Sequence, residues 1–83
     1  MGSKRFDGVR FSAWSDDHTP PHIHGFYAGI EVLVDLLIEE RAVRLSDRVD
    51  NVRPPNAKRS DVNHVRRTGM KHFDELVALW ENA

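Results

Sequence analysis

Three of the five histidines, His18, His22 and His24, lie within seven consecutive residues. The carboxylate of Asp17 precedes the first of them, and two prolines at 20–21 separate the first from the other two. Because proline restricts its own φ and extends the residue before it, this arm is predicted to be stiff. On a strand, a spacing of two places His22 and His24 on one face. Grouped imidazoles and carboxylates bind divalent metals or transfer protons.

Three roles are consistent with this histidine cluster of His18, His22, His24 and Asp17. In a metal site, His22 and His24 are two ligands of zinc or another divalent ion, and His18 or Asp17 is the third. In a metal-free site, the same side chains are acid and base catalysts that cleave a phosphodiester. In a structural or partner-contacting role, they shape the surface without chemistry. No nucleophile-elbow motif is present, which argues against acyl transfer.

The same stretch carries a family resemblance. Its pattern, Asp17-His18-x-Pro20-Pro21-His22-x-His24, is similar to the signature D-H-x-P-P-H-x-H of small bacterial proteins grouped as domain of unknown function 4160. The resemblance implies that the signature joins a first strand to a second, and that further strands lead into a C-terminal helix. It also implies a gene beside that of a second small protein, as in toxin–antitoxin modules. A small partner protein is therefore expected, and no particular reaction is implied.

Alternating apolar and polar residues predict strands in the first half of the chain. Residues 6–15 and 22–27 alternate with a period of two. Residues 30–38 match a strand and a helix equally well, and their β-branched side chains and the family resemblance favour the strand. Residues 42–49 predict a weaker edge strand that is rich in arginine.

A helical pattern dominates the last third of the chain, after a proline-containing loop at 52–58. Over roughly 58–82, apolar residues and one glycine recur at helical spacing on one stripe: Val62, Val65, Gly69, Phe73, Leu76 and Trp80. One helix laid on a sheet would bury this stripe. The predicted fold is therefore α+β, with a small antiparallel sheet of three to four strands within residues 6–50 and a C-terminal helix packed on one face.

Charge is distributed unevenly along the chain, although its net value is only −1. Residues 1–40 sum to −4, residues 41–71 to +6 and residues 72–83 to −3. On the predicted helix, Arg59, Arg66, Arg67 and Lys71 share one broad arc away from the apolar stripe. This basic arc is either a solvated helix face or a surface for a partner protein or for nucleic-acid phosphates. No known nucleic-acid-binding motif accompanies it.

A chain of 83 residues is expected to form one domain over 1–83, with residues 1–5 disordered. It has no cysteine, so neither a disulfide nor a thiolate zinc site can stabilise it. The start lacks the apolar segment of a secretion signal, and no apolar run is long enough to span a membrane. A cytoplasmic location is therefore expected.

Two functions follow from these observations as hypotheses. The first is a small interaction module of a toxin–antitoxin-like or regulatory pair, which binds a partner protein, with nucleic acid as a further candidate ligand. The alternative is a small metal- or histidine-dependent phosphodiesterase. Catalysis requires the histidine cluster to converge around an open cleft, whereas an interaction module requires only an exposed surface of specific shape there.

Overall fold

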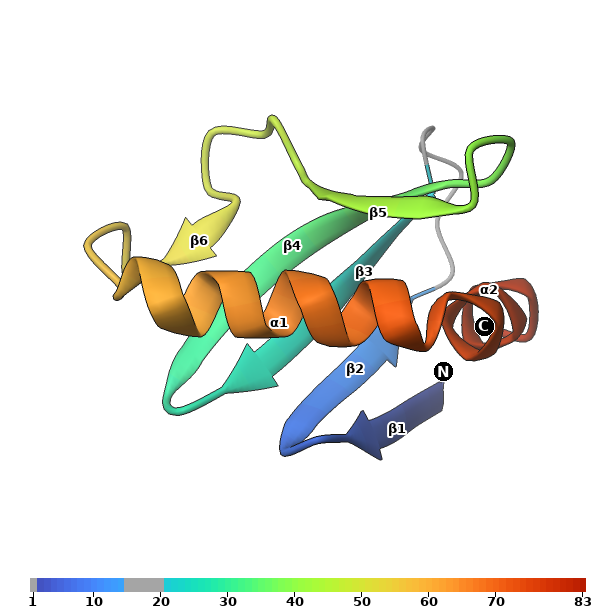
Figure 1. The fold of residues 1–83 in the computed structure, drawn as a ribbon, viewed down its shortest axis with the longest axis horizontal. Helices are drawn as coiled ribbons and strands as arrows, with labels where there is room; N and C mark the ends of the chain where they lie inside the picture. Colours follow the sequence, from blue (N-terminus) through green and yellow to red (C-terminus); the bar gives the residue numbers. More distant parts are fainter. Residues whose placement is uncertain (1, 15–20) are drawn as a thin grey trace.

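A computed structural model of the protein describes residues 2–14 and 21–83. The chain forms a sheet with two helices lying across one of its faces (Figure 1). In chain order the elements are β1 (Gly2–Phe6), β2 (Val9–Ala13), β3 (His22–Tyr27), β4 (Ile30–Leu37), β5 (Ala42–Leu45), β6 (Val52–Arg53), α1 (Arg59–Lys71) and α2 (Phe73–Glu81). The α+β class and the strand at 30–38 are confirmed.

The sheet is antiparallel, as predicted, but it has six strands among the described residues and not three to four. Five of them follow chain order, β1-β2-β3-β4-β5. The short strand β6 pairs with the first part of β4, whereas β5 pairs with the last part. β6 lies in the segment predicted as a loop, and the predicted edge strand at 42–49 is shortened to Ala42–Leu45. Between these two strands, Ser46 and Asn51 hydrogen-bond the backbone of Leu33.

The expectation of disorder in residues 1–5 is wrong for residues 2–5, which belong to β1. β1 pairs with β2 along its whole length, from Gly2 opposite Ala13 to Phe6 opposite Val9. Its own sequence is polar and carries no clear strand pattern, so the order comes from the ladder of backbone hydrogen bonds with β2. Phe6 also stacks on the ring of His72, with ring centroids 4.0 Å apart.

Two-residue turns set the register of the first and third strand pairs. Asp7 and Gly8 have φ values of 50° and 82°, and Ala28 and Gly29 have values of 51° and 79°. Positive φ at both central residues defines a hairpin turn whose twist matches that of the flanking strands. Because a two-residue turn has a fixed length and geometry, each pair of strands that it joins has one register.

The hydrophobic core lies between the sheet and the helices. Alternation turns one side of each long strand towards α1 and α2, and these side chains are β-branched or aromatic in most positions. The buried residues of this layer are Val9, Phe11, Ala13, Ile23, Ile30, Val32, Val34, Leu36 and Val43 from the strands, with Val65, Phe73, Leu76 and Leu79 from the helices.

Two helices replace the single helix predicted over 58–82. The break falls at His72, whose φ of −114° and ψ of 34° lie outside the helical range. The stacking of His72 on Phe6 holds the ring against β1 at this point. Gly69 marks a close approach to β5, since a Cβ there would lie 3.3 Å from a methyl group of Val43. Across the described part of the chain, neither helix combines the length and apolar character needed to cross a bilayer.

The opposite face of the sheet is not covered by a helix among the described residues, and we call it the open face. Strand alternation and register place on it mainly polar and charged side chains, with few apolar ones. Its members are Arg5, Arg10, Ser12, His22, His24, Phe26, Glu31, Leu33, Asp35, Arg44 and Arg53.

Candidate functional site

The described members of the histidine cluster project from β3 on the open face. His22 is 8% exposed and lies opposite Asp35 of β4, while His24 lies between Ser12 of β2 and Leu33 of β4. The two imidazole centroids are 6.0 Å apart and meet edge to face. The strand spacing therefore brings both rings to one side of the sheet.

His24 is held by a hydrogen bond to Glu31 and by stacking against Trp14. Its Nδ1 lies 2.7 Å from Oε2 of Glu31, a residue of β4. A carboxylate only accepts hydrogen bonds, so Nδ1 donates and Nε2 is the acceptor of the neutral ring. The indole of Trp14, one residue beyond β2, stacks on the other side with centroids 4.1 Å apart. The ring is thereby fixed in orientation and tautomer.

These residues line a concavity of about 260 Å³ that we call the histidine hollow. Its walls include Trp14, His22, His24, Glu31, Arg48 and Arg53. At the rim, Arg53 hydrogen-bonds Asp50, and this bond lowers the pKa of the Asp50 carboxyl. Asp50 therefore stays ionised, and Arg53 remains charged beside it because the same bond raises its pKa. The hollow offers a polar, charged rim around an aromatic wall.

Asp35 of β4 is a buried carboxylate on the open face, with only 3% of its surface exposed. Arg44 of β5 lies directly opposite and donates from Nε to its carboxylate at 3.2 Å. Asp35 also lies opposite His22, which places a carboxylate at this end of the open face. A buried carboxylate with a half-exposed arginine partner is a structural ion pair rather than a free base.

The metal hypothesis depends on residues that the structure does not describe. His18 and Asp17, the third-ligand candidates, lie outside residues 2–14 and 21–83. Within those ranges, no three histidine, cysteine, aspartate or glutamate side chains are grouped so that they could hold a metal ion. His22 and His24 alone are two ligands, whereas a zinc site needs at least three protein ligands. Zinc binding by His22, His24 and His18 therefore stays a prediction.

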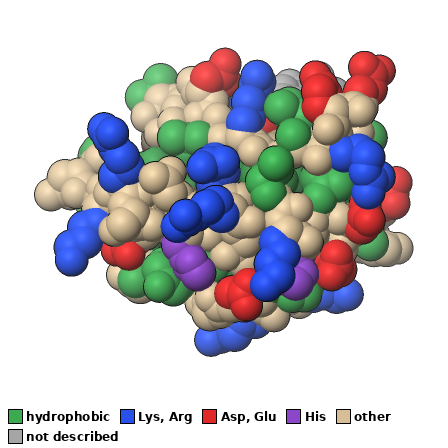
Figure 2. Space-filling view, viewed as in Figure 1, with side chains coloured by type: hydrophobic (Ala, Val, Ile, Leu, Met, Phe, Trp, Pro, Cys, Tyr) green, Lys and Arg blue, Asp and Glu red, His purple; other side chains and the backbone are tan. Residues whose placement is uncertain are grey.

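The basic arc lies on α1, on the opposite side of the sheet from His22 and His24. Figure 2, viewed from the helix side, shows its lysines and arginines interspersed with acidic side chains and two histidines. Arg59, Arg67 and Lys71 are exposed and Arg66 is half-buried. Lys71 forms an ion pair with Asp7 at 3.5 Å, so part of the field of the arc is neutralised within the chain. The arc and the histidine hollow are two separate surfaces.

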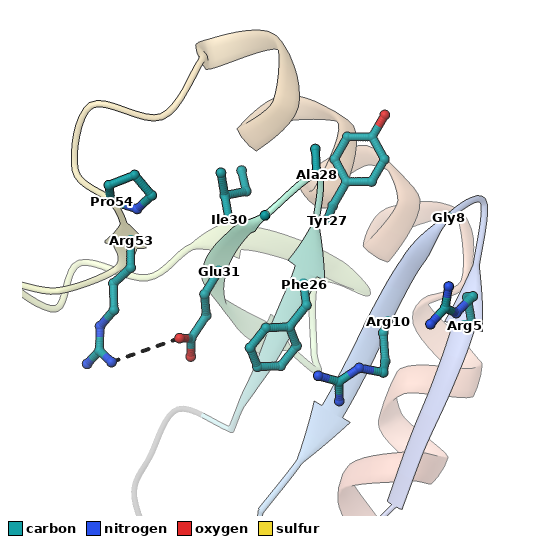
Figure 3. Close-up of a pocket in the computed structure, with 11 residues that line it drawn as sticks. Arg5, Gly8, Arg10, Phe26, Tyr27, Ala28, Ile30, Glu31, Arg53 and Pro54 are labelled. Carbon is teal, nitrogen blue, oxygen red and sulfur yellow. Dashed lines mark ion pairs between the residues drawn. The ribbon is translucent and has the colours of Figure 1, made fainter.

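Sequence reasoning missed a second concavity on the open face, next to the histidine hollow. This arginine groove is an open depression of about 640 Å³ at the hairpin end of the sheet, and its charged walls are Arg5, Arg10, Glu31 and Arg53 (Figure 3). Arg10 lies over the ring of Phe26, with its guanidinium carbon 4.3 Å from the centroid. The turn dipeptide Asp7-Gly8, which pairs β1 with β2, was the signal in the sequence that could have located it.

A comparison with known protein families gives one match, to a family described as "Domain of unknown function (DUF4160)", over residues 8–81. That range includes every strand from β2 to β6 and both helices. No curated protein and no solved structure matches the chain.

Proposed function

The chain belongs to the family described as a domain of unknown function (DUF4160), and from that premise we propose that it is a small interaction module of a toxin–antitoxin-like or regulatory protein pair. The open face of the sheet is the surface that binds the partner protein. The observation that carries this proposal is the position of Trp14. Its side chain is 46% exposed at the edge of the histidine hollow, although tryptophan is one of the largest apolar residues.

Trp14 has the properties of an interface anchor. Binding energy at protein interfaces concentrates in a few residues, and tryptophan and arginine are enriched among them. Here the indole is preorganised by stacking on His24, so little side-chain entropy remains to be lost on binding. Arg48 and Arg53 line the same hollow. An aromatic anchor with arginines around it supports a protein–protein contact at this point.

The charge of the open face indicates an acidic partner. Among the residues that the structure describes on this side of the sheet, arginines outnumber carboxylates: Arg5, Arg10, Arg44, Arg48 and Arg53 stand against Glu31, Asp35 and Asp50. A surface of complementary charge increases the rate of encounter and disfavours basic partners. The small protein expected from the adjacent gene is the first partner to test, and we expect its contact surface to be acidic.

Replacing Trp14 by alanine is expected to weaken binding of that adjacent-gene protein by about tenfold or more, since hot-spot truncations commonly cost at least 2 kcal/mol. Titration calorimetry with the two purified proteins measures the change. Ile38→Ala is the matched control, because Ile38 is 44% exposed but lies in the turn that follows β4. Equal affinity of the wild type and Trp14→Ala would contradict the proposal, as would an equal loss in the control.

A second candidate function, a small phosphodiesterase, is favoured by the hydrogen bond between His24 and Glu31. A carboxylate that orients an imidazole through Nδ1 leaves Nε2 able to accept a proton from water. Hydrolysis of bis(4-nitrophenyl) phosphate, with and without zinc, tests this activity. His24→Ala should lower the rate by about 100-fold or more, and His64→Ala should leave it unchanged. Absence of hydrolysis by the wild type under both conditions would eliminate this function.

A further inference from the structure

In one cross-strand row of the open face, two arginines lie directly opposite each other on neighbouring strands. Arg5 of β1 lies directly opposite Arg10 of β2, and Arg10 lies opposite Phe26 of β3. The row continues through Glu31 of β4 to Arg53 of β6. Like charges directly opposite one another on neighbouring strands are unfavourable. The hairpin turn at Asp7-Gly8 nevertheless holds Arg5 and Arg10 in this register.

Neither arginine of this pair has a carboxylate partner among the described residues. In contrast, Arg44 is paired with Asp35, and Arg53 with Asp50 and Glu31. Arg5 and Arg10 are therefore the unneutralised positive charges at one wall of the arginine groove. A bound anion would offset their mutual repulsion.

Arg10 is also preorganised for binding. Its guanidinium lies on the ring of Phe26, so the flexible side chain is already held in one position. In this stacked geometry the N–H groups at the edge of the planar guanidinium remain available to donate two parallel hydrogen bonds to an oxyanion. Figure 3 shows Arg10 and Phe26 side by side at the groove, with Arg5 on the neighbouring strand.

Glu31 is the acidic group that faces the groove, and its charge is already engaged. One carboxylate oxygen accepts the hydrogen bond from His24 at 2.7 Å, and the other lies 3.9 Å from Arg53. Glu31 therefore opposes an incoming anion less than a free carboxylate would. Arg53 stands beside it on the far wall of the groove, where its charge is shared with Glu31 and Asp50.

We propose that the arginine groove binds the phosphate group of a small phosphomonoester, with Arg5 and Arg10 as the main ligands and Arg53 on the opposite wall. A volume of about 640 Å³ is in the range of sites for small molecules of nucleotide size. The Phe26 ring and the aliphatic stems of the arginines offer apolar contact to the rest of such a ligand. This site adjoins the histidine hollow with Trp14 on the same open face, and Glu31 and Arg53 line both concavities.

The test is titration of the full chain with inorganic phosphate and with adenosine 5′-monophosphate. Binding is measured by calorimetry and by the amide chemical shifts of β1 and β2. Both ligands should bind, and the affinity should fall as salt concentration rises. Arg10→Gln should weaken binding by about tenfold or more, because a charge-assisted bidentate contact is lost. Arg67→Gln, an equal change of charge on α1, should have no effect.

Several outcomes would overturn the phosphate site. No heat and no shift change at millimolar phosphate would do so, as would equal affinities of wild type and Arg10→Gln at matched circular dichroism. If a short single-stranded RNA binds more tightly than the mononucleotide, the ligand of the groove is nucleic acid and not a small phosphomonoester. Trp14→Ala should bind phosphate as the wild type does, so failure of the phosphate site and failure of the partner surface give different results.

Discussion

Phe11→Ala is expected to lower the free energy of unfolding by about 3–5 kcal/mol, the usual cost of removing a buried phenylalanine ring. Phe11 has no solvent exposure and lies on the side of β2 that faces the helices. Alanine would leave a cavity bounded by strands on one side and helices on the other, and a packed core closes such a cavity only partly. Small domains have about 5–15 kcal/mol of stability in total, so this loss is large.

Urea denaturation followed by circular dichroism measures the loss for Phe11→Ala. Phe26→Ala is the matched control, because the same atoms are removed from a half-buried residue on the open face. We expect the control to lose much less stability, since fewer of its contacts lie in the core. Equal losses in the two variants would show that the layer between sheet and helices is not the main core.

Gly25→Ala is expected to destabilise the protein by about 1–3 kcal/mol, the range for overpacking a core. Gly25 lies on the side of β3 that faces α1, and a Cβ there would come within 2.6 Å of a methyl group of Val65 and 3.3 Å of the Phe11 ring. Ordinary contacts between carbon atoms are about 3.5–4.0 Å. The Val65 side chain, or α1 with it, must therefore shift away from β3.

A double-mutant cycle separates this steric effect from the intrinsic cost of changing a glycine. In Val65→Ala the methyl group that would collide with the new Cβ is absent. Gly25→Ala should therefore cost less in the Val65→Ala background than in the wild type. Strictly additive losses in urea denaturation would contradict the predicted collision, and another reason for the glycine would be needed.

Much of the secondary structure follows from local patterns in the sequence. The β-branched residues of 30–38 favoured a strand over a helix, and the structure has β4 there. The alternation of Val9, Phe11 and Ala13 predicted a half-buried strand, and all three face the core. These patterns are informative because burial on one face imposes a period of two on the chain.

Features that depend on pairing between distant segments were not predictable in the same way. β1 is polar and is ordered by its partner strand, and His72 at the helix break stacks on the ring of Phe6, far away in sequence. Asp35 is buried, and its cross-strand neighbours His22 and Arg44 come from two other strands. Local propensity carries no information about such neighbours.

The candidate site was predicted only in part, because some of its contacts also depend on pairing between distant segments. The shared face of His22 and His24 follows from strand alternation, whereas the contacts of His24 with Trp14 and Glu31 depend on the registers of two further strands. Arg5 and Arg10 become neighbours only through the turn at Asp7-Gly8. His18 and Asp17 remain predictions, since they lie outside the described residues.

The order of the strands has a consequence for how quickly the protein folds. Each strand from β1 to β4 pairs with the next one in the chain, and among the described strands β6 returns to an earlier partner, β4. Folding rates fall as contacting residues become more distant in sequence, because longer loops must close before any contact is gained. This meander therefore favours rapid folding that starts from the hairpins with two-residue turns. The contacts between β1 and α2 join the two ends of the sequence, so we expect them to form last.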